Sequence, residues 1–247
     1  MEDKGKYKIK LRKKQEFIFP LLLITYYFLF TIHMMILQLF SNPGLVFPWL
    51  IALLIAITAH EFSHGLSAYF LGDDTAERAG RLTLNPLAHL DVMGSVLLLL
   101  VGFGWAKPVP INYAFLKRGK LGKFLVSAAG IAANLLLAVI FVLALKIILI
   151  TTGLGASNYL IKFLAFLIYI NLALFVFNLF PIAPLDGYRI FESFAPAAFR
   201  SAAPFLERWG FFILIALVFL TDIIGRLIIF AVNVLSALSG VNLLGFI

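Results

Sequence analysis

Residues 46–71 read VFPWLIALLIAITAHEFSHGLSAYFL, an apolar stretch that carries three ionisable side chains within five residues, His60, Glu61 and His64. About 20 such residues cross a bilayer as a helix, so we expect a membrane span here. A charged side chain at bilayer depth costs about 2.5–3.5 kcal/mol, and it persists where a partner or a function compensates. Residues four apart share one helical face, so both imidazoles can reach a single ion.

The chain has no cysteine, so any metal must be held by nitrogen and oxygen. Zinc accepts neutral imidazole nitrogen in a tetrahedral site, and a catalytic zinc keeps one position for water. Glu61 lies one residue beyond His60, about 100° around the helix, where it can take a proton from that water instead of binding the metal. The alternative is a hydrogen-bonded polar cluster that packs helices together, which the intramembrane cost disfavours.

A catalytic zinc site needs a third protein ligand. The candidates in this sequence are His33, His89, Asp91 and Asp186. Asp186 is favoured because Pro181 and Pro184 interrupt the backbone just before it, and unsatisfied backbone at membrane depth is tolerated where it lines a cavity. His33 is interpreted as a helix-packing residue, and His89 and Asp91 as residues that hydrogen-bond to backbone. The alternative for Asp186 is an interfacial residue after a helix kink.

The composition indicates that lipid surrounds most of the chain. Hydrophobic residues make up 62% and charged residues 13% of the 247 residues, too few charges for a soluble domain. The net charge of +8 is concentrated in residues 4–14 and 107–123. Beside long apolar spans, such basic clusters indicate cytoplasmic flanks at anionic lipid headgroups, and we expect no nucleic-acid partner.

We predict an all-α integral membrane protein that forms a single membrane-embedded domain, 1–247, with a core at 46–190. About six spans are expected, with the N-terminus in the cytoplasm, and a broken last span would leave five. The predicted spans are residues 17–40, 46–71, 121–150 and 159–180, followed by two short spans within 209–247 that turn near 221–222. Residues 95–105 are too short to cross, so a re-entrant segment followed by extended, β-like backbone at 108–112 is expected there.

Two stretches together resemble the site-2 protease family of intramembrane zinc metalloproteases: HEFSH at 60–64 and NLFPIAPLDG at 178–187. Residues 80–94, 105–112 and 129–134 also resemble family elements. The resemblance implies that Asp186 is the third ligand of one Zn²⁺ per chain. It implies a substrate-positioning role for Asn178, and we expect the same of Asn134. It further implies the compact prokaryotic form without a PDZ domain, in a cell membrane.

The resemblance implies hydrolysis of peptide bonds within or near transmembrane segments of membrane-protein substrates, with Glu61 as general base and the site in the cytoplasmic half of the bilayer. A helical substrate must unwind locally to expose its amide, and the extended backbone at 108–112 could pair with the unwound strand. One alternative is a divalent-metal transporter that uses the same His, Glu and Asp cluster. Another is an inactive membrane scaffold. The oligomeric state is left open.

Overall fold

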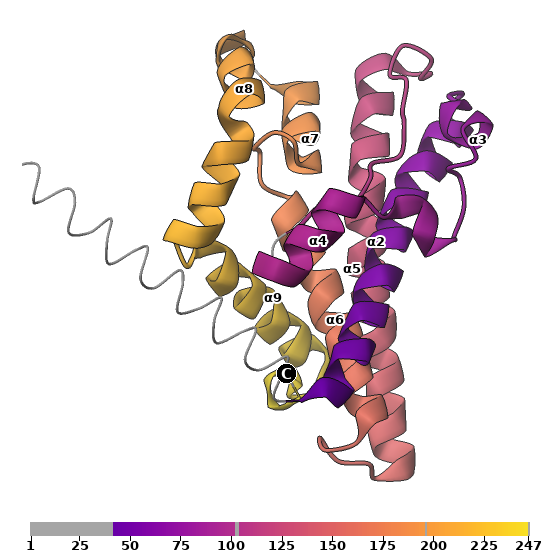
Figure 1. Ribbon diagram of the computed structural model, residues 1–247, viewed down its shortest axis with the longest axis vertical. Helices are drawn as coiled ribbons and strands as arrows, with labels where there is room; N and C mark the ends of the chain where they lie inside the picture. The colour runs from indigo at the N-terminus through magenta and orange to yellow at the C-terminus, as the bar shows by residue number, and fades with distance from the viewer. Residues whose placement is uncertain (1–41, 102–103, 196, 247) are drawn as a thin grey trace, which may run out of the picture. The chain divides into compact units, whose positions relative to one another are not determined.

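The computed structural model describes residues 42–101, 104–195 and 197–246, and every regular element within these ranges is helical. Three long helices pack against one another: α2 (Pro43–Phe70), α5 (Gly119–Thr152) and α6 (Tyr159–Asn178) (Figure 1). Their bounds agree with three predicted spans to within a few residues. The predicted first span, residues 17–40, and its His33 lie outside the described residues.

Helix α6 is the central member of this group, because half of its apolar stretch is buried, compared with 22% in α2 and 17% in α5. Ala52 and Ala56 of α2 and Ala138 of α5 are fully buried, and such small side chains let helix backbones approach closely. Large apolar side chains on the outer faces, such as Phe47 and Ile150, stay exposed. Lipid is the environment that covers such faces, so the chain is an integral membrane protein.

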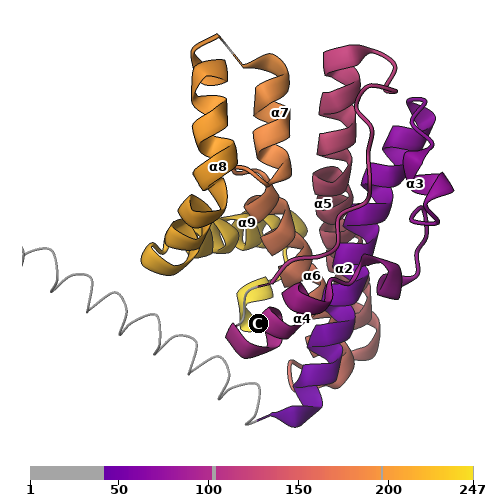
Figure 2. The same cartoon turned by 45° about the horizontal axis from the view of Figure 1, so that its top comes forward.

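The C-terminal third contains α7 (Asp186–Phe194), α8 (Ala197–Leu220), α9 (Ile223–Ser239) and the short 3₁₀ turn η2 (Leu243–Gly245). Helices α7 and α8 lie side by side in opposite directions (Figure 2). The turn between α8 and α9 falls at 221–222, as predicted. Residues 188–210, which the sequence predicts as a short connection between spans, are mostly helical, and α8 continues through Pro204.

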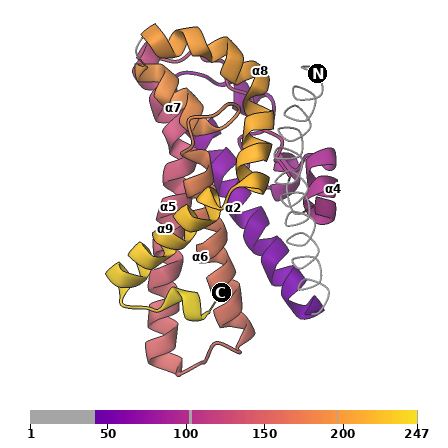
Figure 3. The ribbon, with the colours of Figure 1, turned by 90° about the vertical axis from the view of Figure 1, so that its left-hand side faces the viewer.

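Four helices of the described residues are long and apolar enough to cross a membrane: α2, α5, α6 and residues 201–220 of α8. Helix α9 is apolar but has only 17 residues, and it runs across α6 (Figure 3). The predicted total of six spans therefore stays a prediction.

The segment between α2 and α5 contains α3 (Thr75–Arg78), the 3₁₀ turn η1 (Pro86–His89) and α4 (Val92–Val101). Helix α4 has ten residues, too few to cross a bilayer. The chain then doubles back: a Cβ atom on Gly94 would lie 2.1 Å from the Trp105 carbonyl oxygen, so only glycine fits there. Residues 108–112, where β-like backbone was expected, form no strand, and the β-type pairing of the described residues is one isolated bridge between Leu90 and Ala106.

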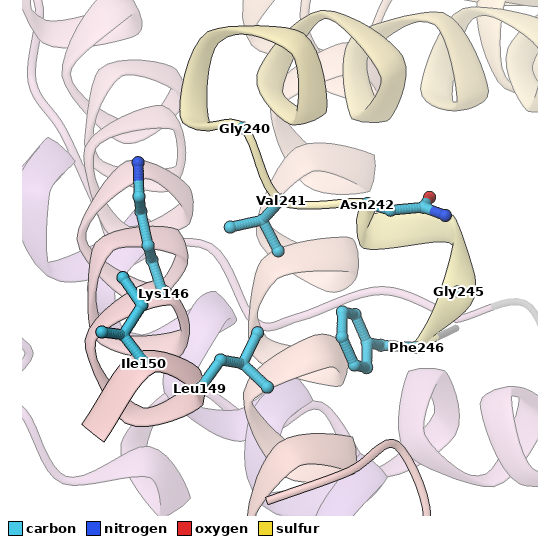
Figure 4. A pocket seen from close by; sticks show the side chains of 8 residues that line it. All are labelled: Lys146, Leu149, Ile150, Gly240, Val241, Asn242, Gly245 and Phe246. Carbon is cyan, nitrogen blue, oxygen red and sulfur yellow. The ribbon is translucent and has the colours of Figure 1, made fainter. Parts of the chain in front are cut away.

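A pocket lies at the far end of α5, between Lys146, Leu149 and Ile150 and the loop that follows α9 (Figure 4). The Lys146 ammonium group donates to the Ser239 carbonyl oxygen at 2.7 Å, at the C-terminal end of α9. This contact joins α9 to α5, and a cation suits the negative end of a helix dipole. The pocket is well separated from the ionisable cluster described next, which contacts α5 at residues 126–134.

Candidate metal centre

Three side chains that the sequence singled out meet at one point. His60 and His64 lie one turn apart on α2, with 3.0 Å between their Nε2 atoms. Asp186 is the first residue of α7, and its Oδ2 lies 3.0 Å from each of these two nitrogens. The two imidazoles are buried and the carboxylate is half-buried. Residues 122 positions apart in sequence thus share one small space.

The outer nitrogens of both imidazoles fix which tautomer is present. His60 Nδ1 lies 2.6 Å from Asn134 Oδ1, and His64 Nδ1 lies 2.7 Å from the Val126 carbonyl oxygen. Both partners can only accept, so each Nδ1 carries a hydrogen and donates it. The Nε2 lone pairs then face each other and the carboxylate. Hydrogen bonds of this kind, from the ring nitrogen that faces away from the site, are typical of metal-binding histidines.

The three ligand atoms fit a zinc ion. Three acceptor atoms this close repel one another unless a cation lies among them, and two neutral imidazoles with one carboxylate suit zinc. Ligand atoms about 2.0 Å from a tetrahedral zinc lie about 3.3 Å apart, close to the 3.0 Å separations seen here. His60, His64 and Asp186 would hold the ion.

Asn134 connects the site to all three long helices. Its amide nitrogen donates to the Ala56 carbonyl oxygen at 3.1 Å and to Asn171 Oδ1 at 2.9 Å, while its oxygen accepts from His60. Asn171 in turn donates to the Leu167 carbonyl oxygen of its own helix. Both asparagines are fully buried. Asn171 was not singled out from the sequence, although an amide in the middle of an apolar span is a signal that could have found it.

Gly130 allows α5 to approach the two imidazoles. A Cβ atom built on this glycine would lie 2.4 Å from His64 Nε2 and 2.7 Å from His60 Cε1. No side chain fits at that distance, so α5 forms a wall of the site with its bare backbone. This role could not be assigned from the sequence, because the contact joins residues 66 or more positions apart.

Asp186 reaches the site through a tight turn after α6. The chain doubles back so closely that a Cβ atom on Gly187 would lie 2.4 Å from the Leu179 carbonyl oxygen. The turn contains a cis peptide bond between Ala183 and Pro184. Asn178, the last residue of α6, donates through its side-chain amide to the Leu174 carbonyl oxygen at 3.0 Å. The turn residues therefore lead directly from the end of α6 to the carboxylate.

Glu61 lies beside the three-residue cluster and is not part of it. Its Oε2 accepts a hydrogen bond from the backbone N–H of Val109 at 2.8 Å. His89 bonds through Nε2 to the Thr83 carbonyl oxygen, and Asp91 accepts from the backbone N–H of Gly94. Backbone hydrogen bonding was the predicted role of these last two residues, and it is confirmed.

Comparison with known proteins shows the family to which the chain belongs. The model of peptidase family M50 matches residues 146–221, which include Asp186. YwhC of Bacillus subtilis (strain 168), named "Putative zinc metalloprotease", is 45% identical over 179 residues, which cover 71% of this chain and 82% of YwhC. The chain belongs to peptidase family M50. This M50 peptidase is also 33% identical over 175 residues to Rip2 of Mycolicibacterium smegmatis, which carries the same description.

The second match covers 66% of the M50 peptidase described here and 63% of Rip2. Rip2 of Mycobacterium tuberculosis is 32% identical over 160 residues, 61% of this chain and 59% of that protein. No solved structure matches the chain. The predicted site-2 protease resemblance is confirmed: the protein is an intramembrane zinc metalloprotease, and the transporter alternative is not favoured.

Proposed function

We propose that this M50 peptidase hydrolyses a peptide bond within or near a transmembrane segment of a membrane-protein substrate. His60, His64 and Asp186 hold its zinc, and Glu61 is the general base. The observation that carries this assignment is the mutual 3.0 Å separation of the three ligand atoms. It is supported by the tautomer that Asn134 and Val126 impose on the two imidazoles.

Zinc, when bound, lowers the pKa of a water molecule and polarises a carbonyl oxygen. Glu61 takes a proton from the attacking water as the water oxygen bonds to the carbonyl carbon of the substrate. It then delivers that proton to the amide nitrogen as the C–N bond breaks, so that an amine and a carboxylic acid leave. Among the described residues, the Glu61 carboxylate has one hydrogen bond, from Val109 to Oε2, which leaves Oε1 to carry the proton.

The two asparagines have different roles in this proposal. Asn134 is fully buried and its amide is fully used by His60, Ala56 and Asn171, so it orients the imidazole of His60. The substrate-positioning role expected for it rests on the resemblance alone. Asn178 is half-buried at the end of α6 and remains the candidate for contact with substrate.

We place the site in the cytoplasmic half of a prokaryotic cell membrane, in a protein of about six spans. Four basic residues at the start of α5 support this orientation by the positive-inside rule: Lys117, Arg118, Lys120 and Lys123. Lys123 forms a salt bridge of 2.7 Å with Glu192 of α7, so the helix that begins with Asp186 lies at the same end of α5. In this proposal α4 is the re-entrant segment, and the protein forms one membrane-embedded domain.

Zinc content and cleavage, measured together in liposomes, test the proposal. The probe is a single-span protein with small, helix-breaking residues in the middle of its span. We expect Glu61→Gln to keep zinc and lose cleavage by about 100-fold or more, because it removes the base but no ligand. His60→Ala and Asp186→Ala should lose both zinc and cleavage. Wild-type activity in Glu61→Gln would refute the assignment of the base, and full zinc content in Asp186→Ala that of the ligand.

A further inference from the structure

The proline-containing segment at 106–112, which has no regular secondary structure apart from the bridge at Ala106, is attached to α2 and the turn after it by two carboxylates. Val109 donates its N–H to Glu61 at 2.8 Å, and Asn112 donates its N–H to Asp73 Oδ2 at 2.7 Å. Val109 lies between Pro108 and Pro110, and proline has no N–H. The Val109 amide is therefore the single donor of its tripeptide, and the register of the segment decides whether it reaches Glu61.

Asp73 is unusual because it is a fully buried acidic residue. Its side chain is 0% exposed, and a buried carboxylate is costly unless hydrogen bonds compensate. Its Oδ1 accepts from the backbone N–H of Thr75 at 3.0 Å and from the Thr75 hydroxyl group. Its Oδ2 accepts from Asn112. One oxygen thus shapes the turn that leads into α3, and the other holds a segment 39 residues further along the chain.

The two attachments, at Val109 and Asn112, lie only three residues apart. Backbone of this length spans about 10 Å and, with its prolines, has little freedom to change its length. A slip of one residue at Asn112 would move the Val109 amide about 3.3 Å away from Glu61, beyond hydrogen-bond distance. The contact at Asp73 therefore supports the contact at Glu61 from one side, while the Lys107 N–H, which donates to the His89 carbonyl oxygen at 2.9 Å, holds the segment on the other side.

We propose that Asp73 is a positioning residue for the hydrolysis: through the Asn112 amide it sets the register of residues 106–112, so that the Val109 amide holds the Glu61 carboxylate in place. This inference rests on the proposed role of Glu61. Displacement of a catalytic group by about 1 Å can cost about 100-fold in rate. The loss is expected mainly in kcat, because the zinc ligands stay in place; a smaller rise in KM is expected because the neighbouring backbone moves with Val109.

The test uses zinc-loaded full-length protein and the single-span probe. Asp73→Asn keeps the shape of the side chain but turns one oxygen into a donor, and Asn112→Pro removes the amide that Asp73 holds. We expect each to lower kcat by about 10- to 100-fold per zinc-loaded molecule, with a smaller change in KM. The double variant should be no slower than the slower single variant, because both changes break the same hydrogen bond.

Two control variants distinguish a change in the register of residues 106–112 from general destabilisation of the protein. Thr75→Ala removes a donor from the other oxygen of Asp73 and should keep wild-type kcat. Asn112→Ala keeps the amide and should lose less activity than Asn112→Pro. Hydrogen exchange across residues 106–112, followed by mass spectrometry, should be faster in Asp73→Asn and Asn112→Pro and unchanged in Thr75→Ala.

Unchanged exchange, additive losses, or a rise in KM with wild-type kcat would overturn the proposal. Glu61→Gln is measured alongside. If Glu61→Gln stays active, the proposed function fails at its base and this inference falls with it. If Glu61→Gln is inactive while Asp73→Asn keeps wild-type kcat, this inference alone fails.

Discussion

At Gly130 a single hydrogen atom stands where any other residue would place carbon against the imidazoles of His60 and His64. The site thus depends on a residue that contributes no functional group. Helix interiors usually disfavour glycine by about 1 kcal/mol relative to alanine. Here the close approach of α5 outweighs that propensity, because the backbone must pass beside the ligands.

We expect Gly130→Ala to weaken zinc binding by about 10- to 100-fold, because the added methyl group must push an imidazole aside. Gly225→Ala is the matched control: it also lies within a helix, but its Cβ would meet nothing within 4 Å. Zinc titration against a competing chelator measures both. Equal affinity in the two variants would contradict the role given to Gly130.

Among the elements, the segment at 106–112, between α4 and α5, offers a backbone N–H group that a substrate strand can bind. Its Val109 and Asn112 amides are bound to carboxylates, whereas the Ile111 N–H has no acceptor among the described residues. A free amide on extended backbone next to the general base could pair with an unwound substrate strand.

Ile111→Pro should therefore raise the KM for the single-span probe by about tenfold, which corresponds to the loss of one hydrogen bond of about 1.4 kcal/mol. Ile111→Val keeps the amide and the branched side chain and serves as the control. Steady-state cleavage in liposomes measures both. Pairing by this strand would be excluded if the proline variant cleaved like the valine variant.

For the whole molecule, the proposed orientation in the membrane rests on the distribution of charge. The basic residues at the start of α5 lie at one end of that helix, and the loop to α6 at 153–158, which carries no charged residue, lies at the other. The α5 helix has 34 residues, about 51 Å, and so exceeds the thickness of the hydrocarbon core. A helix of this length and apolar character can cross the bilayer, and in the proposed orientation its two ends lie on opposite sides.

The chain has no cysteine, so single cysteines can report this orientation. Ser157 and Lys120 are both exposed in the fold, so a difference in labelling reports the side of the membrane. In intact bacterial cells, a membrane-impermeant maleimide should label Ser157→Cys, on the outer side, and leave Lys120→Cys, on the cytoplasmic side, unlabelled. Lysed cells should label both. Labelling of Lys120→Cys in intact cells would reverse the proposed orientation.

Much of the fold and part of the site could be predicted from the sequence. The spans of α2, α5 and α6 follow from apolar length, and the shared face of His60 and His64 follows from helical spacing, which are both local properties. Asp186 was favoured by its proline-rich turn. The Val126 carbonyl could not be foreseen, because it is a backbone atom brought to the site by tertiary packing. The helical stretch at 197–210 was not predicted, because this part of the chain is more polar than the spans and was interpreted as a short connection between them.

The three ligand atoms form a triangle with equal edges of 3.0 Å, and this shape has a consequence for metal selectivity. Copper(II) binds nitrogen and oxygen sites more tightly than zinc does when the ligands are free to move, and it prefers a square plane. Three corners of a square with bonds of about 2.0 Å include one pair of atoms about 4 Å apart. Fixed carbonyl partners oppose such a rearrangement of the imidazoles, so the geometry itself discriminates against the stronger competitor.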